Sequence, residues 1–463
     1  MRSIVIVLIC LSVCGCAIMG SADPYVSATV PSHGACARTP AASRATLPEG
    51  TITLQRAIEI GLANNPEIAA LEWDATAAEA RQEQAFAERL PKLSLVGEYT
   101  HHLDEQRLLP VGQPGDPAIL SREIFSGDVI LSLPLFTGGR LINQVKAADM
   151  LQQAASHRLF RSREELVFNI SSVFFSILAQ RYVIESLEFS VRTLDEHVDR
   201  IDALIAADKA VKVDRMRTEV RLADVRQQLV REKNLMAIQR RVLANLLGLE
   251  DHTDKISLQG ELELPGKTTV PEFHAALAKA WSERDDYLAA KTALEAQARN
   301  VDVARAGHWP TVFLQGSYGG RWGVGPTSGT GDEFGDLGRI GLAMQVPLFE
   351  GGQVNARVRE QHAALVAAEE RLRTLEFQVR LEVETALYNL RSSEQRWEVM
   401  TKSIVQAKES LRIEQQKYNL GKGAIVDVLD AQAALLESET TYYRVLAEYD
   451  TALAQLRLAM GGE

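Results

Sequence analysis

The sequences PLFTGGR (Pro134–Arg140) and PLFEGGQ (Pro347–Gln353) stand at equivalent points of the chain, 213 positions apart (347 − 134). In each, an apolar segment ends in two glycines, and a stretch without glycine or proline follows. Glycine and proline disfavour helix interiors, so their absence predicts one helix over Arg140–Ala207 and another over Gln353–Leu420. At about 1.5 Å per residue each is a rod on the order of 100 Å long, for which a compact domain has no room.

The first long segment carries a stripe of apolar residues at intervals of three and four between Leu166 and Ile205, interrupted only by Gln180. A stripe that repeats every seven residues predicts a coiled-coil seam. Because a straight helix drifts off a strict seven-residue repeat, the helices should supercoil left-handedly. The other members of the stripe are Ile170, Val173, Ile177, Ile184, Leu187, Val191, Leu194, Val198 and Ile201.

The chain is a duplication. Val213-Asp214 matches Val426-Asp427 at the same offset, and upstream Pro91 matches Pro310 at an offset of 219 (310 − 91). A period this long predicts a repeated domain and not a solenoid of short repeats. The expected organisation is a signal peptide at 1–15, a lipidated N-terminus and flexible tether at 16–50, a first repeat at 51–248, a connector at 249–271 with a short strand, and a second repeat at 272–463.

Each repeat is expected to contain a first helix, two strands, a long helix and a last helix. The first helix of repeat one should begin at Leu54, break near Asn64-Asn65-Pro66 and end by Arg89, because Pro91 cannot continue it. In repeat two we expect one helix over 272–307 and a last helix over 425–460.

The predicted strands alternate apolar and polar residues over about 9 to 12 positions, with hairpin loops at about 102–127 and 319–338. One strand alone would fit a soluble hairpin equally well. Both hairpins, however, follow one helix and are followed by another. This arrangement favours strands of a transmembrane β-barrel, whose sequence pattern is weak in any single strand. The apolar faces are Leu93, Leu95, Gly97 and Tyr99; Val129, Leu131, Leu133 and Leu135; Val312, Leu314, Gly316 and Tyr318; and Leu342, Met344, Val346 and Leu348.

Four strands cannot close a barrel in lipid, where every backbone polar group needs a partner and open sheet edges are not tolerated. The chain is therefore expected to oligomerise. A dimer would supply eight strands, whose interior side chains fill, whereas a trimer would supply twelve, enough for a lumen.

The N-terminus carries Arg2 and then an apolar run from Ile4 to Val13, which has the length of a signal peptide. The following Val13-Cys14-Gly15-Cys16 is similar to a lipobox, so we expect cleavage before Cys16 and lipidation of that residue. Ordinary cleavage after a small residue such as Ala22 is the alternative. In either case too few cysteines remain for a disulfide framework.

The composition excludes several classes of function. A net charge of −11 argues against nucleic acid as a partner. No Walker loop, nucleophile elbow, cysteine metal pair or His-x-x-x-His spacing occurs, and His101-His102 lies at a predicted strand end. We therefore expect no catalytic residue, cofactor or metal site.

The sequence resembles the TolC-type outer membrane factor family, and with the lipobox most closely its lipoprotein branch, which serves RND-type efflux systems. The resemblance lies in the duplication, in the Pro-Leu-Phe-x-Gly-Gly junctions and in the run YNLGKGAIVDVLDAQ at Tyr418–Gln432. It implies a mainly α fold with membrane strands: a trimeric 12-stranded β-barrel continued by a periplasmic α-helical barrel. The residues at the strand–helix junctions are Pro91, Pro134, Gly138, Gly139, Pro310, Pro347, Gly351 and Gly352.

The family implies that the two helix turns, at about 206–214 and 419–426, form a constricted periplasmic tip that docks onto an adaptor. Asp427 and Asp430 match its acidic gate positions, and their i, i+3 spacing places both on one helix face. An aspartate in a first helical turn also stabilises the helix dipole, and the two roles are compatible. The turns contain Lys209, Tyr418, Gly421 and Gly423.

The sequence departs from the family at one gate position. Gly423 stands where some members carry an arginine, which puts a latch at that residue in doubt. In the first repeat Asp214 and Arg217 are the equivalents of Asp427 and Asp430, so Arg217 is a candidate partner for a closing ion pair.

The function expected from these observations is a passive outer membrane duct for small molecules or ions, as a homotrimer in outer membrane lipid, loaded by a periplasmic adaptor and an inner-membrane transporter. A type I protein secretion channel and a non-conducting coiled-coil lipoprotein rod or adhesin are the alternatives.

Overall fold

The computed structural model describes residues 51–107, 120–208, 210–249, 257–262, 270–324 and 333–462. The predicted signal peptide, the tether with Cys16, and Lys209 lie outside these residues.

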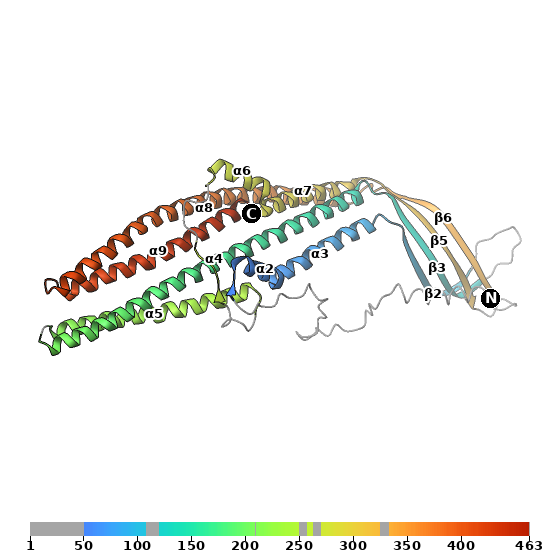
Figure 1. The fold of residues 1–463 in the computed structure, drawn as a ribbon. Coiled ribbons are helices and arrows are strands. Elements are labelled where there is room, and N and C mark those ends of the chain that lie inside the picture. The colour runs from blue at the N-terminus through green and yellow to red at the C-terminus, as the bar shows by residue number, and fades with distance from the viewer. Residues whose placement is uncertain are drawn as a thin grey trace. The chain divides into compact units, whose positions relative to one another are not determined.

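The described residues form two copies of one sequence of elements (Figure 1). The long helices α4 and α8 have 67 residues each and begin directly after the glycine pairs, as predicted. The first copy consists of α2 (Leu54–Asn64), α3 (Pro66–Ala87), β2 (Lys92–Arg107), β3 (Leu120–Phe136), α4 (Arg140–Ala206) and α5 (Lys212–Leu246). The second consists of α6 (Phe273–Glu283), α7 (Asp285–Arg305), a 3₁₀ turn (Ala306–His308), β5 (Thr311–Val324), β6 (Glu333–Gln345), α8 (Gln353–Asn419) and α9 (Ile425–Met460). The connector between the copies contains β4 (Ser257–Leu258), which pairs in parallel with β1 (Thr51–Ile52), the strand that precedes the first copy.

The glycine pairs turn the chain from strand to helix. Gly139 and Gly352 stand directly before α4 and α8 with φ angles of 85° and 83°, a left-handed conformation that other residues adopt only at a cost. At Gly138 space is limiting as well, because an added Cβ would lie 2.6 Å from the Cβ of Trp309. The junction therefore requires glycine for conformation and for close approach.

The strands form one antiparallel sheet in the order β2-β3-β5-β6. Its register aligns Leu95 with Val129, Val129 with Tyr318, and Tyr318 with Gly338. Residues directly opposite each other share a face, so the predicted apolar sides of all four strands lie on one side of the sheet. That side is exposed: Leu95 is 79% accessible to solvent.

The predicted strand lengths are wrong. The strands have 16, 17, 14 and 13 residues, and they run into the segments predicted as loops. Phe125 lies in a row of aromatic rings, 4.7 Å from Tyr99 and 5.8 Å from Trp322. Directly beyond this row the regular apolar alternation ends, since the next outward residues of β2 and β3 are His101 and Glu123, 3.5 Å apart. The hydrogen-bonded strands continue past this point, so the sequence pattern predicted only the apolar part of each strand. At the other end β6 stops at Gln345, which leaves the predicted strand residues Val346 and Leu348 outside it.

The single helix predicted over 272–307 is also wrong, because it is broken at Arg284. This is the repeat equivalent of Asn65 (284 − 65 = 219), which caps α3 by accepting hydrogen bonds from the amides of Glu67 at 2.8 Å and Ile68 at 3.3 Å. In the first copy Pro66, directly after Asn65, predicts the break. The second copy has no proline or glycine at the equivalent position, so its sequence does not predict one.

The Arg284 side chain is almost completely buried and holds the break in place. Its guanidinium donates to both carboxylate oxygens of Asp286, at 2.7 and 2.9 Å, to Glu382 of α8, and to the carbonyl of Ala459 at the end of α9. Although burial alone would raise it, the pKa of Asp286 lies below its usual value because of these bonds and the charge of Arg284. Arg161 of α4 donates to the neighbouring Leu458 carbonyl at 2.9 Å, so two arginines hold the C-terminal end of α9.

The helices form a layer whose order follows from their contacts. Near the sheet the order is α3-α4-α7-α8, and toward the helix turns it is α5-α4-α9-α8 (Figure 1). In the second region the predicted seam of α4 is buried against α5 and α9, in a cluster that includes Leu187, Leu194, Ile201, Leu222, Val225, Val428 and Leu436. In both regions one edge is a helix of the first repeat and the other is α8.

We expect Arg284→Ala to lower the free energy of unfolding by about 2–3 kcal/mol, because it removes the main hydrogen-bonded counter-charge of the partly buried carboxylates of Asp286 and Glu382, although Asp286 keeps Arg161 at 3.8 Å. The measurement is urea-induced loss of the helical circular dichroism signal of the detergent-solubilised protein. Arg305→Ala is the matched control: its side chain is exposed and pairs with Asp302 at 3.4 Å, so the loss should stay below about 1 kcal/mol. Equal losses in the two variants would contradict the role given to Arg284.

Candidate functional site

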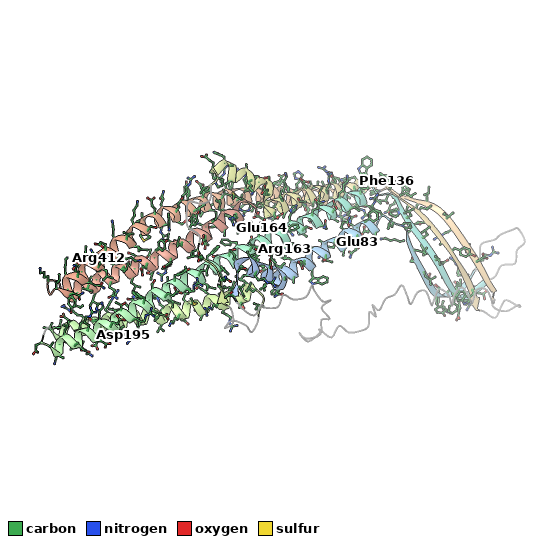
Figure 2. The ribbon with its side chains drawn as sticks, in the orientation of Figure 1. Glu83, Phe136, Arg163, Glu164, Asp195 and Arg412 are labelled. Carbon is green, nitrogen blue, oxygen red and sulfur yellow. The ribbon has the colours of Figure 1, made fainter. Side chains whose placement is uncertain are left out.

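The two helix turns lie at the ends of the long helices remote from the sheet (Figure 1). Figure 2 shows Asp195 and Arg412 on the approaches to these turns and Phe136 at the sheet junction. In the second turn Gly421 has a φ of 71°, and the amide of Lys422 donates to the carbonyl of Lys417 at 2.9 Å. Asp208, the repeat equivalent of Gly421, adopts the same left-handed conformation with a φ of 54°. The two turns thus share one backbone geometry.

Gly423 fits closely against the end of α8. A Cβ at this position would lie 3.0 Å from the Cβ of Lys417. A side chain at position 423 would therefore require Lys417 to shift by a few tenths of an ångström.

The two aspartates on α9 have different surroundings. Asp427 lies in the first turn of α9, and its carboxylate accepts a hydrogen bond from the amide of Ala424 at 3.3 Å. This is the helix-starting role of an acidic residue at a positive helix end. Asp430 is exposed one turn further on and lines a groove between α5 and α9.

This groove has a volume of about 380 Å³ and brings Arg217 and Asp430 together. Arg217, Arg221 and Asp224 line it from α5, and Asp430 lines it from α9. Within the part of the chain described, neither Arg217 nor Asp430 belongs to an ion pair of 4.0 Å or less. Their charges are therefore available to each other or to another molecule.

Tyr418 connects the two turns. Its ring packs against the apolar cluster of α4, α5 and α9, and burial together with the negative charge of Asp214 raises the pKa of its hydroxyl. Asp214 belongs to the first turn of α5, so the end of α8 lies beside the first repeat.

Salt bridges that sequence reasoning missed join α5 to α4 along the turn-side half of the layer. Arg215 donates to Asp202 at 2.7 Å, Arg226 to Asp195 at 2.8 Å, and the Lys233 ammonium lies 2.7 Å from Glu188. Across an antiparallel helical hairpin, opposite charges whose residue numbers add up to nearly the same value, here 417, 421 and 421, are a signal that could have found them. They supplement the buried apolar cluster that holds α4 and α5 together.

His197 is a second feature that the sequence did not reveal. It is buried on α4 near the turns, and its Nε2 atom has no hydrogen-bond partner. Burial, and secondarily the charge of Arg200, lower the pKa of His197, while Glu196 acts in the opposite direction. The folded state therefore holds this ring neutral.

The lowered pKa of His197 makes the turn region sensitive to acid. Below about pH 6.5 the unfolded segment binds a proton that the folded segment does not. The stability contributed by the neutral ring is fully present above that pH and is lost as pH falls through the folded pKa.

Amide hydrogen exchange around His197, corrected for its intrinsic pH dependence, should therefore be faster one pH unit below about pH 6.5 than one pH unit above it. His197→Leu should abolish this effect, whereas replacement of the exposed His362 should preserve it; an identical response in both variants would refute it.

Comparison with known proteins places these features in a family context. A family model described as "Outer membrane efflux protein" matches residues 57–249 and 276–462, which is most of the chain and falls in both repeats. The chain is similar to the outer membrane protein TolC of Vibrio cholerae serotype O1, with 22% identity over 407 residues that cover 86% of this chain and 88% of the relative. It is also similar to the outer membrane protein OprJ of Pseudomonas aeruginosa, with 25% identity over 427 residues covering 88% and 84%.

Solved structures share the fold. The outer membrane protein VceC of Vibrio cholerae has a TM-score of 0.75 at 21% identity, covering 88% of this chain and 96% of that one. The outer-membrane channel OprN has a TM-score of 0.74 at 20% identity, covering 89% and 90%.

Proposed function

The chain belongs to the outer membrane efflux protein family, and we propose that three copies of it form the passive exit duct of a tripartite efflux system. It is an outer membrane channel protein whose helices extend into the periplasm. In the proposed system an inner-membrane pump and a periplasmic adaptor deliver small molecules or ions to the helix turns. The family match does not favour the alternatives of a protein secretion channel or a non-conducting rod.

The observation that carries this proposal is the open sheet. Its order leaves β2 and β6 as unpaired edges among the described strands, and its apolar face is exposed. In a membrane both edges need partners, because lipid offers no hydrogen bonds to free amides and carbonyls. Pairing β6 of one copy with β2 of the next satisfies both edges, and three copies give twelve strands and a lumen.

The helical layer supports the same ring. One edge of the layer is formed by α3 near the sheet and by α5 near the helix turns, and the other edge is formed by α8. In the ring, α3 and α5 of one copy would therefore pack against α8 of the next copy along the whole length of the layer. Both edge helices expose apolar residues that nothing in the described chain covers. On α5 they include Val213, Met216, Val220, Val230 and Ile238, and on α8 they include Phe377, Leu381, Tyr388, Val405 and Ile413.

The purified protein in detergent is expected to have the mass of three chains and to form conducting channels in planar bilayers. A monomer, or a trimer that conducts no ions, would overturn the proposed duct. Intact-mass measurement on the same sample tests the proposed lipidation, since a diacylated Cys16 and cleavage after Ala22 give different masses.

We place the gate of the duct in the groove between α5 and α9. Arg217 and Asp430 line this groove together. In a trimer the three equivalent grooves would place three copies of the Asp430 carboxylate around the axis. Asp427 contributes a second acidic ring as well as capping α9. Rings of carboxylates favour cations, and an ion pair of Arg217 with a carboxylate across neighbouring helices would narrow the opening.

Asp427→Asn combined with Asp430→Asn should lower cation selectivity, measured as the reversal potential in a salt gradient. Asp199→Asn, an exposed aspartate on α4 outside the groove, is the matched control and should leave it unchanged. In the same recordings Arg217→Ala should raise the conductance of the resting channel, whereas Arg215→Ala, whose pair with Asp202 lies outside the groove, should not. Unchanged selectivity and unchanged resting conductance would remove the gate from this groove.

A further inference from the structure

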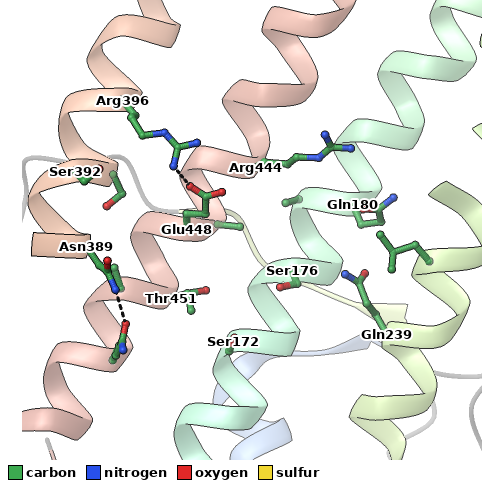
Figure 3. A pocket seen from close by; sticks show the side chains of 16 residues that line it. Ser172, Ser176, Gln180, Gln239, Asn389, Ser392, Arg396, Arg444, Glu448 and Thr451 are labelled. Atoms are coloured by element: carbon green, nitrogen blue, oxygen red, sulfur yellow. Dashed lines mark hydrogen bonds and ion pairs between the residues drawn. The ribbon is translucent and has the colours of Figure 1, made fainter. Parts of the chain in front are cut away.

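A polar recess of about 540 Å³ lies between α4, α5, α8 and α9, well away from the helix turns (Figure 3). Side chains of all four helices line it. Serine, threonine, asparagine, glutamine and arginine predominate, and no aromatic ring takes part. Neither the gate nor the membrane sheet accounts for it.

The recess and the connector lie on opposite faces of the helical layer. Phe174 and Leu178 of α4 meet Gly260 of the connector, and Arg181 donates to the carbonyls of Leu258 and Gly260. Ser176, which lines the recess, is rotated by about 200° from Phe174 at 3.6 residues per turn. In the closed ring proposed above we assign the connector to the outer face, because on the inner face three copies of it would lie in the path of the solute. The recess therefore faces the channel, a conclusion that rests on the duct proposed above.

The rear wall of the recess is a buried polar cluster. Gln180, the one polar residue in the α4 seam, donates to the Glu232 carboxylate at 2.7 Å, and Arg444 of α9 donates to the other oxygen at 3.1 Å. Gln180 and Glu232 are each only 5% exposed. Such a cluster fixes the helix register, but for that purpose these three residues would be enough.

The front of the recess carries more polar groups than helix packing needs. Arg396 of α8 is paired with Glu448 of α9, and Asn389 donates to Gln455 at 3.2 Å (Figure 3). Each guanidinium has further N–H groups beyond its paired nitrogen. The enclosed Oε1 atom of Gln239 has no partner. Donors and acceptors thus face open volume.

We propose that this recess is a transit site for an uncharged, hydroxyl-rich solute of about disaccharide size. Arg396 is paired with Glu448, and Glu232 behind the wall pairs with both Arg444 and Arg231, so every charged side chain of the wall already has a partner of opposite charge within the protein. A hydroxyl group both donates and accepts, which matches the mixture of hydroxyl, amide and guanidinium groups in the wall. The volume lies within the range of small-molecule sites, roughly 300–1,000 Å³.

The test uses trehalose, an uncharged disaccharide, on the full-length channel in planar bilayers. Trehalose added on the helix-turn side should interrupt the current reversibly, and polyethylene glycol of equal size, which accepts but does not donate hydrogen bonds within its chain, should not. Ser176→Leu and Thr451→Leu fill the recess and should each weaken the trehalose block about tenfold, the effect of losing one to two hydrogen bonds. Thr401→Leu, on α8 outside the recess, is the matched control.

Equilibrium dialysis of radiolabelled trehalose against the detergent-solubilised protein separates this inference from the duct itself. A channel that conducts but neither binds nor is blocked by trehalose refutes the transit site alone. Block by citrate without block by trehalose refutes the chemical class, and equal block in all variants refutes the location. A protein that does not conduct refutes the duct, and dialysis with the Ser176→Leu variant then still decides whether the recess binds the sugar.

Discussion

The backbone N–H and C=O groups along the free edges of β2 and β6 lack hydrogen-bond partners in the described chain, and the rest of the architecture depends on how these groups are satisfied. A soluble protein could leave these edges to water, but the exposed apolar face of the sheet belongs in lipid, where water is absent. Closure must therefore come from other copies of the chain. The helical layer has the same open order, with a first-repeat helix at one edge and α8 at the other, so one mode of association satisfies strands and helices together.

Much of this architecture could be predicted from the sequence, because long segments obey a single period. The helix α9 begins and ends at the predicted residues, and both long helices begin where the glycine pairs end. The strand faces were predicted correctly since alternation is a local property, whereas the strand ends were not, because polar residues extend the ladder without extending the pattern. The break at Arg284 was invisible for a related reason: a buried ion-pair network across three helices does in the second copy what Asn65 and Pro66 do locally in the first.

The residues of the candidate site likewise fall into those that the sequence predicts and those that only the structure reveals. Asp430 and Arg217 could be named from the repeat and from family resemblance, and the structure adds that they share one groove. Arg221, Asp224 and His197 could not be named, since their positions depend on how α5 and α9 meet beside α4. Gln180 reads in the sequence as a flaw in an apolar stripe, and only the fold reveals the carboxylate of Glu232 that it faces.

The arginines at the end of α9 have a mechanical consequence. Arg161 and Arg284 hold the carbonyls of Leu458 and Ala459, while Asp430 lies 29 residues before Ala459, toward the opposite end of the same helix. At about 1.5 Å per residue this is a lever of roughly 45 Å, and a tilt of about 6° at the anchored end displaces Asp430 by about 5 Å. A small rotation of α9 about its anchored end would therefore move the carboxylate of Asp430 by several ångströms.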